Sequence, residues 1–385
     1  MSHAKPPRAD PSEVNRNEAD RSEDAQLRSL LKRVCETPAP TFDEGARATL
    51  VEQLLRSSGA TPRRDAVGNV LAWLPGGHGP TVALVAHLDT VFGADVDVRV
   101  REENERCWRA PGIGDNSASV AQLLHLAAQA DRGALLDRPR LLLGFTVGEE
   151  GLGDLRGARR LVADVGADLD AFVAVDGHMG SVVDAGVGSR RLRASFTARG
   201  GHSWGDYPSP SAVHALGDAV HALTRIPVPG APRSSLNVGQ VGGGSAVNAI
   251  AASSWLTLDL RSLDRVTLDT LRAEAEKRLR SVARRHRVEL VVEPVGDRPA
   301  GRSDDGWLAG AASAALEAHG VASRMAASST DANAAMAAGI PAVCLGVYDG
   351  GDAHRLEEWL DPTSLAVGAS VLRDLLARLA EGRRG

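Results

Sequence analysis

Hydrophobic residues follow two different spacings along the chain, and this separates segments with different predicted structures. From about residue 25, helical patterns such as "DAQLRSLLKRVCET" and "TFDEGARATLVEQLLRSSG" precede short runs that are apolar almost throughout. Three such runs are "TVALVAHLDTV", "RLLLGFTVG" and "AFVAVDG", with the helical pattern "SASVAQLLHLAAQA" between the first two. Nearly continuous apolar runs are typical of strands that helices cover on both faces. This part of the sequence predicts an α/β sandwich.

Near Gly188 the spacing changes to alternation of apolar and polar residues. In "SRRLRASFTARGG" the apolar side chains fall on one side and the arginines mostly on the other, and "SWLTLDLRSLD" alternates in the same way. Alternation predicts antiparallel strands with one face in water. With two helical patterns between the strands and the further strand "VELVVEP", the order resembles β-α-β-β-α-β. We expect a small ferredoxin-like α+β domain inserted into the first.

The chain has 385 residues, which favours two domains over a single core. We predict a discontinuous catalytic domain over 25–187 and 298–385, with the inserted domain over 188–297. Residues 1–24 are polar and charged and lack an apolar segment, so we expect a disordered tail and no secretory signal.

Composition narrows the functional classes. The net charge of −5 gives no electrostatic reason to expect a nucleic-acid partner, and no apolar run reaches the roughly 20 residues that a membrane span needs. The three cysteines, Cys35, Cys107 and Cys344, lie far apart and are odd in number. That pattern predicts a reduced, cytoplasmic protein without a disulfide framework.

Candidate metal ligands follow the apolar runs, where strands are predicted to end. They are His87 and Asp89 in "VALVAHLDTV", Asp115 in "GIGDNSAS", Glu149 and Glu150 in "TVGEEG", Asp176 in "AVDGH" and His354 in "GGDAHRLEE". Each alone is more often a surface or turn residue, but in an open α/β sheet ligands bind at the carboxyl ends of strands. Histidines and carboxylates without cysteine suit a catalytic zinc or a similar divalent ion, and the carboxylates suffice for two ions that share one ligand.

The adjacent pair Glu149 and Glu150 fits this interpretation. Two neighbouring carboxylates repel each other, and burying them costs free energy unless a cation or proton compensates. Two cations would offset the repulsion. Because adjacent side chains point in different directions, one glutamate can bind metal while the other faces the reacting water.

These motifs, in this order, resemble those of the di-zinc metallopeptidases and deacylases that include peptidase T, carnosinase, aminoacylase and acetylornithine deacetylase (metallopeptidase family 20). "AHLDTV" is similar to the family's His-x-Asp-Thr-Val motif, and the resemblance extends from about Leu27 to the C-terminus. It implies a zinc-peptidase-like mixed sheet sandwiched by helices, and an inserted domain that acts as a lid and forms a homodimer.

The resemblance also implies roles for the candidate ligands. His87 and Asp176 would bind one metal, Glu150 and His354 the other, and Asp115 would bridge the two. Glu149 would be the general base that activates the bridging water, and Asp89 would hydrogen-bond the His87 ring and fix its tautomer. The cofactors would be two divalent ions, with zinc the first choice and manganese or cobalt as alternatives.

In the inserted domain the resemblance implies substrate-binding residues. His202 would stabilise the oxyanion, in its own or the partner's site, Asn248 would hydrogen-bond substrate, and Arg261 would bind its carboxylate. Ser329, Thr330 and Asp331 would line the pocket. Two alternatives stay open: Arg261 could instead pair with Asp259 or Asp264, and Asn248 could be a turn residue.

Two positions depart from the family pattern. Ser117, Ala118 and Ser119 follow Asp-Asn where the family often has a basic residue and a glycine. Arg355 follows His354 where serine or glycine is usual, although Glu358 keeps the usual four-residue spacing. Neither change removes a ligand.

The substrate is predicted from a single position. Residue 176 is aspartate, as in the peptidase T and dipeptidase branches, whereas the deacylases more often have glutamate. The shorter side chain leaves room for a substrate ammonium, which favours an aminopeptidase or dipeptidase acting on short peptides. The alternatives are an N-acyl-amino-acid deacylase, similar to acetylornithine deacetylase or a desuccinylase, and a catalytically silent homologue that binds metal or peptide.

Overall fold

The computed structural model describes residues 11–133, 135, 138–303 and 306–382. The chain divides into two compact units. Unit 1 comprises Met1–Val182, Asp305–Met325 and Val343–Gly385, and unit 2 comprises Val183–Asp304 and Ala326–Ala342. Unit 2 therefore contains the segment 188–297, a few residues on either side of it, and residues 326–342.

Unit 1 is built on a mixed sheet. Its strands, in spatial order, are β1 (Arg63–Arg64), β2 (Val70–Trp73), β6 (Arg140–Thr146), β3 (Thr81–His87), β7 (Ala171–Val175) and β17 (Ala342–Leu345). Strand β3 runs parallel to β6 and β7, whereas β2 runs antiparallel to β6. Every residue of β3 and β7 is buried, which explains why both read as continuous apolar runs. The mixed α/β fold predicted from the sequence is confirmed.

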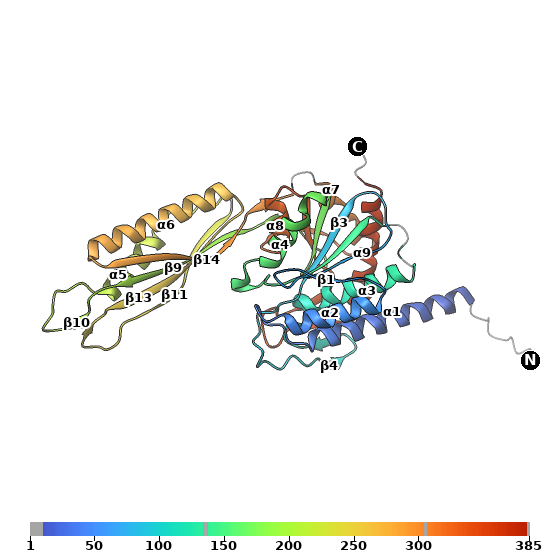
Figure 1. Cartoon of the computed structure of the whole chain (residues 1–385), viewed down its shortest axis with the longest axis horizontal. Coiled ribbons are helices and arrows are strands. Elements are labelled where there is room, and N and C mark those ends of the chain that lie inside the picture. The colour runs from blue at the N-terminus through green and yellow to red at the C-terminus, as the bar shows by residue number, and fades with distance from the viewer. Residues whose placement is uncertain (1–10, 134, 136–137, 304–305, 383–385) are drawn as a thin grey trace, which may run out of the picture. The chain divides into compact units, whose positions relative to one another are not determined.

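Helices bury the apolar faces of this sheet (Figure 1). Those of unit 1 are α1 (Pro11–Cys35), α2 (Gly45–Ser57), α3 (Ser119–Asp131), α4 (Arg156–Val165), α7 (Trp307–Ala318) and α9 (Ser364–Ala380). Helices α1, α3 and α9 pack against one another, and α7 packs on α9. A second, four-stranded antiparallel sheet joins distant segments in the order β18 (Asp349–Gly351), β19 (Trp359–Asp361), β5 (Cys107–Arg109) and β4 (Arg101–Asn104).

Helix α1 corrects the expectation of a disordered tail over 1–24. Residues 11–24 are helical, while residues 1–10 lie outside the described part of the chain. The charges near this helix's middle have folded partners: Glu23 Oε1 lies 3.2 Å from His125 Nε2 and accepts a hydrogen bond from Arg373 Nη1. The segment has the composition of a solvated tail, but Glu23 near its end contacts α3 and α9, and Leu27 and Leu31 of the same helix are buried in the core.

Unit 2 has a four-stranded antiparallel sheet with two helices on one face. The strands, in spatial order, are β11 (Ser234–Gly243), β13 (Ser253–Ser262), β9 (Gly188–Thr197) and β14 (Glu289–Arg298). Helices α5 (Ala212–Thr224) and α6 (Arg265–His286) cover the face that carries Leu192, Ala194 and Phe196. Along the chain the long elements follow the order β9-α5-β11-β13-α6-β14, which is the ferredoxin-like order that the alternating pattern predicts.

Shorter elements complete unit 2. They are the pair β10 (Gly201–His202) and β12 (Ala249–Ile250), the pair β8 (Ser181–Gly186) and β15 (Gly301–Arg302), strand β16 (Arg324–Ser328) and helix α8 (Ala332–Ala337). The first residues of β8 and of β16 belong to unit 1.

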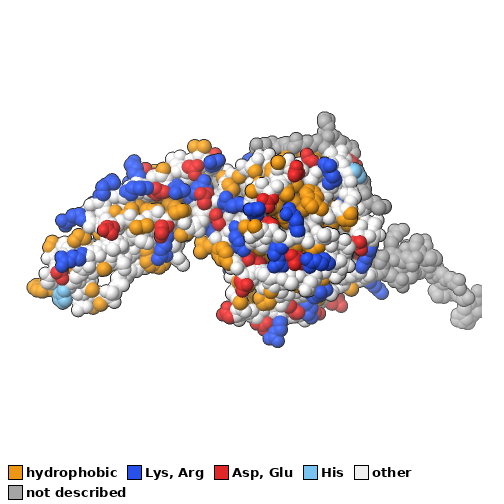
Figure 2. All heavy atoms as spheres, viewed as in Figure 1, with side chains coloured by type: hydrophobic (Ala, Val, Ile, Leu, Met, Phe, Trp, Pro, Cys, Tyr) orange, Lys and Arg blue, Asp and Glu red, His pale blue; other side chains and the backbone are white. Residues whose placement is uncertain are grey.

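The surface carries both signs of charge. Figure 2 shows basic and acidic side chains interspersed over the face in view, in keeping with the small net charge. Within the described residues, no helix combines the length and the apolar character that a bilayer span requires.

The ion pairs of Glu23 give a prediction for stability. Hydrogen bonds from His125 and Arg373 outweigh burial and lower the pKa of Glu23 to about 2. A depressed carboxyl pKa stabilises the fold above the unfolded-state value of 4.5, and this contribution disappears as the pH falls towards 2. We expect Glu23→Gln to lower the free energy of unfolding at pH 7 by about 1 to 2 kcal/mol, a range that discounts the shift for partial exposure.

The measurement is chemical unfolding of both proteins at several pH values. The difference in the free energy of unfolding between the wild type and Glu23→Gln should become smaller as the pH falls from 4.5. The control Glu105→Gln, at an exposed position, should leave the free energy of unfolding unchanged. A difference that persists undiminished at pH 2.5 would contradict the assignment.

Candidate metal centre

The sheet of unit 1 places the predicted ligands at one edge. His87 ends β3, Glu149 and Glu150 follow β6, and Asp176 follows β7. Because β3 is parallel to both neighbours, the carboxyl ends of all three strands lie together. The loop before α3 adds Asp115, and the loop after β18 adds His354.

These side chains form three groups of potential ligands, of which one is His87, Glu149 and Glu150 and the other two share Asp115. His87, Asp115 and Asp176 bring one ligand atom each to within 4.8 Å of one another, and so do Asp115, Glu150 and His354. His87 Nε2 lies 3.0 Å from Asp115 Oδ1, and His354 Nε2 lies 3.0 Å from Asp115 Oδ2. The two oxygens of one carboxylate thus face two different histidines, as a residue shared by two cations would.

The remaining distances extend each group. His87 Nε2 is 4.0 Å from Asp176 Oδ2, and His354 Nε2 is 3.0 Å from Glu150 Oε1. Asp115 Oδ1 is buried and has no hydrogen-bond partner in the described structure, despite its short distance to His87. A buried carboxylate oxygen without a donor, facing a histidine nitrogen, fits a cation between the two.

The pKa shifts show how strongly this site attracts positive charge. Hydrogen bonds that His354 donates to Asp115 and Glu150 raise its pKa to about 11. Burial alone would lower the pKa of His87, but Asp115 and Asp89 raise it well above its usual value. The same contacts hold the pKa of Asp115 far below its usual range, although burial opposes this. Four carboxylates face two histidines, so bound divalent cations would relieve an excess of negative charge.

Asp89 acts on this site through the backbone. Its carboxylate accepts hydrogen bonds from the main-chain N–H of Glu149 and of Glu150, each at 2.9 Å, and from Thr41 Oγ1 at 3.0 Å. The expected bond to the His87 ring takes a different form: His87 Nδ1 lies 2.9 Å from the main-chain carbonyl of Asp89 but 3.7 Å from its carboxylate. The carbonyl fixes the tautomer that leaves Nε2 free for metal, while the carboxylate orients the two glutamates.

Glu358 is the residue whose part in the site the sequence analysis missed. It is buried, and its carboxylate accepts hydrogen bonds from the main-chain N–H groups of Gly112, Gly114 and Asp115 at 2.8 to 2.9 Å. Burial raises its pKa to about 7, with the charge of Asp115 acting in the same direction and the amide bonds opposing. The only signal in the sequence was that Glu358 follows His354 by four residues, as is usual in the family. The contacts of Glu358 with the backbone give a reason for this spacing.

Ser117 occupies the first position where the sequence departs from the family pattern. It is buried, and its Oγ donates a 2.6 Å hydrogen bond to the carbonyl of Gly112. A hydroxyl therefore ties this loop to itself where the resemblance expects a basic side chain.

The substrate-binding residues inferred from the resemblance all lie in unit 2, whereas the metal-ligand groups lie in unit 1. His202 is exposed on β10, with Nδ1 accepting bonds from the N–H groups of Trp204 and Gly205, and Asn248 is exposed in a loop. Arg261 Nε donates a 2.8 Å bond to Asp259, which is the alternative that the sequence analysis left open.

The segment with Ser329, Thr330 and Asp331, predicted to line the pocket, also lies in unit 2. Ser329 Oγ accepts a hydrogen bond from Arg298 Nη1 at 3.2 Å, and Asp331 is buried immediately before α8. The roles of these six residues in substrate binding stay predictions.

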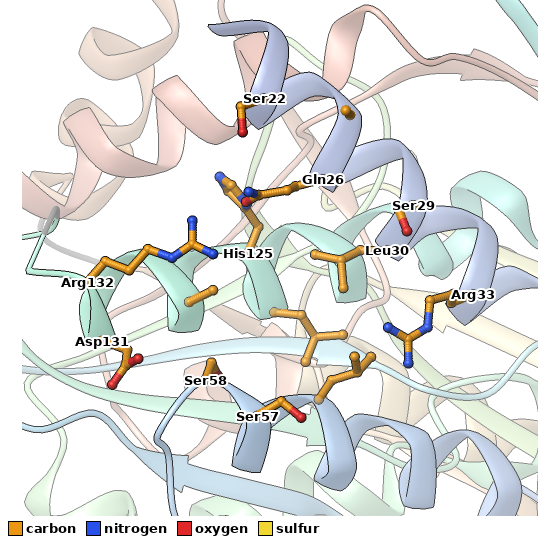
Figure 3. A pocket seen from close by; sticks show the side chains of 14 residues that line it. Ser22, Gln26, Ser29, Leu30, Arg33, Ser57, Ser58, His125, Asp131 and Arg132 are labelled. Atoms are coloured by element: carbon orange, nitrogen blue, oxygen red, sulfur yellow. The ribbon is translucent and has the colours of Figure 1, made fainter. Parts of the chain in front are cut away.

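A pocket of about 490 Å³ lies elsewhere in unit 1, between α1, α2 and α3 (Figure 3). Gln26 and Arg33 line it from α1, Ser57 from α2, and His125 and Asp131 from α3. None of the described residues that line it belongs to the metal-ligand groups. The candidate catalytic site is therefore identified by the potential metal ligands and not by this pocket.

An α/β fold with two histidine–carboxylate groups that share one aspartate is that of a metal-dependent hydrolase. Residues 83–378 match the model of peptidase family M20/M25/M40, and the chain therefore belongs to this family. A Mycobacterium tuberculosis protein, named as a candidate succinyl-diaminopimelate desuccinylase (DapE), is 29% identical over 358 residues, covering 90% of this chain and 97% of that protein.

Solved structures share the fold. A tripeptidase from Staphylococcus aureus superposes with a TM-score of 0.79 at 20% identity, covering 93% of this chain and 99% of that one. The YXEP protein of Bacillus subtilis, described as a dinuclear metal-binding peptidase of the M20 family, has a TM-score of 0.68 at 17% identity, covering 94% and 100%.

Glu358 generates the prediction of this section. In Glu358→Gln an NH₂ group, which cannot accept a hydrogen bond, replaces one of the two oxygens that accept three main-chain N–H bonds. The loop that carries Asp115 is then held less firmly. We expect metal affinity to fall about 10- to 100-fold, as for other groups that orient metal ligands. Calorimetric zinc titration measures this, with the exposed neighbour Glu357→Gln as control. Unchanged affinity in Glu358→Gln would refute the positioning role.

Proposed function

We propose that this protein holds two divalent cations, zinc before manganese or cobalt, and hydrolyses the amide bond of short peptides. His87 and Asp176 would hold one cation, Glu150 and His354 the other, and Asp115 both. The observation that carries the proposal is the position of Asp115, whose two oxygens each lie 3.0 Å from a different histidine. The absence of cysteine from both groups favours a catalytic over a structural zinc site.

When bound, two such cations polarise the scissile carbonyl and lower the pKa of a nearby water. Glu149 is then the general base: its carboxylate takes a proton from the attacking water and delivers it to the leaving amine. Two features of the chain suit Glu149 to this task. It is adjacent to the ligand Glu150, and Asp89 holds its main-chain N–H, so the side chain projects from a fixed backbone.

The substrate proposal rests on Asp176. Its side chain is partly exposed beside His87, and an aspartate there leaves more room than a glutamate would for a substrate ammonium. This favours peptides with a free amino end, hence an aminopeptidase or dipeptidase. One observation favours N-acyl amino acids instead: the 29% identical relative from Mycobacterium tuberculosis is named for desuccinylation. A catalytically silent homologue is not favoured, because Glu149 and all five proposed ligands are in place.

Two further proposals concern the setting of the enzyme. We infer a homodimer formed through the segment 188–297, with His202 stabilising the oxyanion in its own or the partner's site. We also infer a cytoplasmic location, which the three free cysteines support because a reducing compartment keeps thiols unpaired.

A peptide library tests the substrate class. Zinc-loaded protein is incubated with short peptides whose N-termini are free, acetylated or succinylated, and products are identified by mass spectrometry. We expect cleavage of the free-amine peptides. Release of acetate or succinate alone would assign the protein to the deacylases. No hydrolysis of either class, with two zinc ions bound, would contradict the proposed catalysis.

Glu149→Gln separates catalysis from metal binding. The substitution keeps the shape of the side chain but removes the proton acceptor. Glu149 is outside the two groups that share Asp115, and it forms a third group with His87 and Glu150. We expect zinc content equal to that of the wild type and turnover reduced about 100- to 10,000-fold, the usual contribution of a general base. An unchanged rate would refute the assignment, and loss of zinc would show that Glu149 is a ligand.

A further inference from the structure

Several exposed apolar side chains of unit 1 follow residues of the candidate metal centre closely in the sequence. Among the described residues of unit 1, the large hydrophobic side chains that solvent reaches are Phe42, Trp73, Val91, Leu152, Met325 and Leu356, exposed by 43 to 64%. Four of these six belong to loops that carry the centre. Exposed apolar groups scattered singly need no explanation, but a cluster beside a reactive site marks a binding surface.

Each of the four is linked to a different part of the site. Val91 follows Asp89 by two residues, Leu152 follows Glu150 by two, and Leu356 follows His354 by two. Phe42 follows Thr41, whose hydroxyl donates to the Asp89 carboxylate at 3.0 Å. We refer to Phe42, Val91, Leu152 and Leu356 as the apolar rim.

Phe42 is held in a conformation that its side chain disfavours. The N–H of Asp43 donates to the carbonyl of Pro40 at 2.8 Å, which closes a β-turn with Phe42 at its third position. The φ angle of Phe42 is 78°, so the turn requires the left-handed backbone that glycine normally supplies. A bulky residue there is an outlier of the kind that clusters at ligand-binding sites.

Specific contacts maintain this strained position. The N–H of Phe42 donates to Glu44 Oε1 at 3.0 Å, and Arg156 Nη2 donates to both oxygens of Glu44 at 2.8 and 2.9 Å. The guanidinium of Arg156 lies over the Phe42 ring, 5.0 Å from its centroid. Arg156 also packs against Gly148, directly before the two glutamates. The ring is thus fixed beside the Glu149–Glu150 loop and still 64% exposed.

We propose that the apolar rim is a subsite for a large apolar side chain next to the scissile amide. The preferred substrates are therefore peptides, or acyl amino acids, with a residue such as leucine or phenylalanine at that position. A diaminopimelate-like side chain, which is charged at its end, would gain little from this surface. The proposal rests on the proposed function, because it takes the metal centre as the place of hydrolysis.

Charges at the rim agree with this assignment. Arg156 is engaged by Glu44, and the exposed Arg355, beside Leu356, lies 3.6 Å from Asp352. Both of these arginines therefore have acidic partners of their own. An apolar side chain can cover the Phe42 ring without leaving a charge unpaired.

Paired substrates test the subsite. Wild-type protein is given Leu-Gly-Gly and Ala-Gly-Gly, or N-acetyl-leucine and N-acetyl-alanine if it is a deacylase. We expect kcat/KM to be at least about tenfold higher for the leucine member, since a hydrophobic pocket discriminates roughly 10- to 200-fold for small differences in apolar size. A ratio near one would overturn the proposal.

Variants locate the preference. Phe42→Gly and Leu152→Ala should each lower the leucine-to-alanine ratio at least about threefold. Met325→Ala, at a position that is 48% exposed and outside the rim, should leave it unchanged. Glycine suits the left-handed turn, so Phe42→Gly should melt at or above the wild-type temperature. If these side chains had only a structural role, the leucine-to-alanine ratio of kcat/KM would fall only together with the melting temperature. An unchanged ratio in both rim variants would refute the assignment.

A binding measurement separates failure of the subsite from failure of the proposed function. Zinc-loaded protein is titrated with leucine hydroxamate and with glycine hydroxamate, which need no turnover. Tighter binding of the leucine compound, weakened by Phe42→Gly, would support the subsite even if no peptide or acyl amino acid is hydrolysed. Equal or absent binding of both compounds would overturn it.

Discussion

One carboxylate, that of Asp115, is the constraint on which the site depends. Its two oxygens face His87 and His354, which lie far apart in the sequence. Asp115 is the member that the two histidine–carboxylate groups share. A side chain with this task cannot tolerate a mobile backbone. Two residues hold the backbone of this loop. The buried carboxylate of Glu358 accepts hydrogen bonds from three main-chain N–H groups of the loop, and the Ser117 hydroxyl donates to a carbonyl of the same loop.

The same device, a buried carboxylate that binds backbone amides, recurs on the other side of the site. Asp89 accepts the N–H groups of Glu149 and Glu150, and so holds the backbone of the proposed ligand and of the proposed base. Burying a carboxylate costs free energy unless hydrogen-bond donors or cations compensate its charge. Here main-chain N–H groups of the surrounding loops are the donors, and they connect the candidate metal centre to the fold. The excess of carboxylates over histidines follows the same logic, since bound cations would offset its negative charge.

Much of this could be predicted from the sequence because it depends on local pattern. Continuous apolar runs identified β3, β6 and β7, and the parallel edge rule then placed His87, Glu149 and Asp176 together. Contacts between distant segments could not be predicted in this way. The amides that Glu358 binds, the carbonyl that fixes the His87 ring, and the partners that order Glu23 are set only by tertiary packing. Phe42 is a further case, because a turn with phenylalanine at the glycine position contradicts local preference.

The count of zinc ions per chain tests the central claim most directly. Protein freed of metal, then dialysed against buffered zinc, should bind close to two equivalents in the wild type. In Asp115→Ala, where both groups lose their shared member, it should bind fewer than one. Mass spectrometry with inductively coupled plasma gives both numbers. One equivalent in the wild type, or two retained in Asp115→Ala, would contradict the account of a carboxylate shared between two cations.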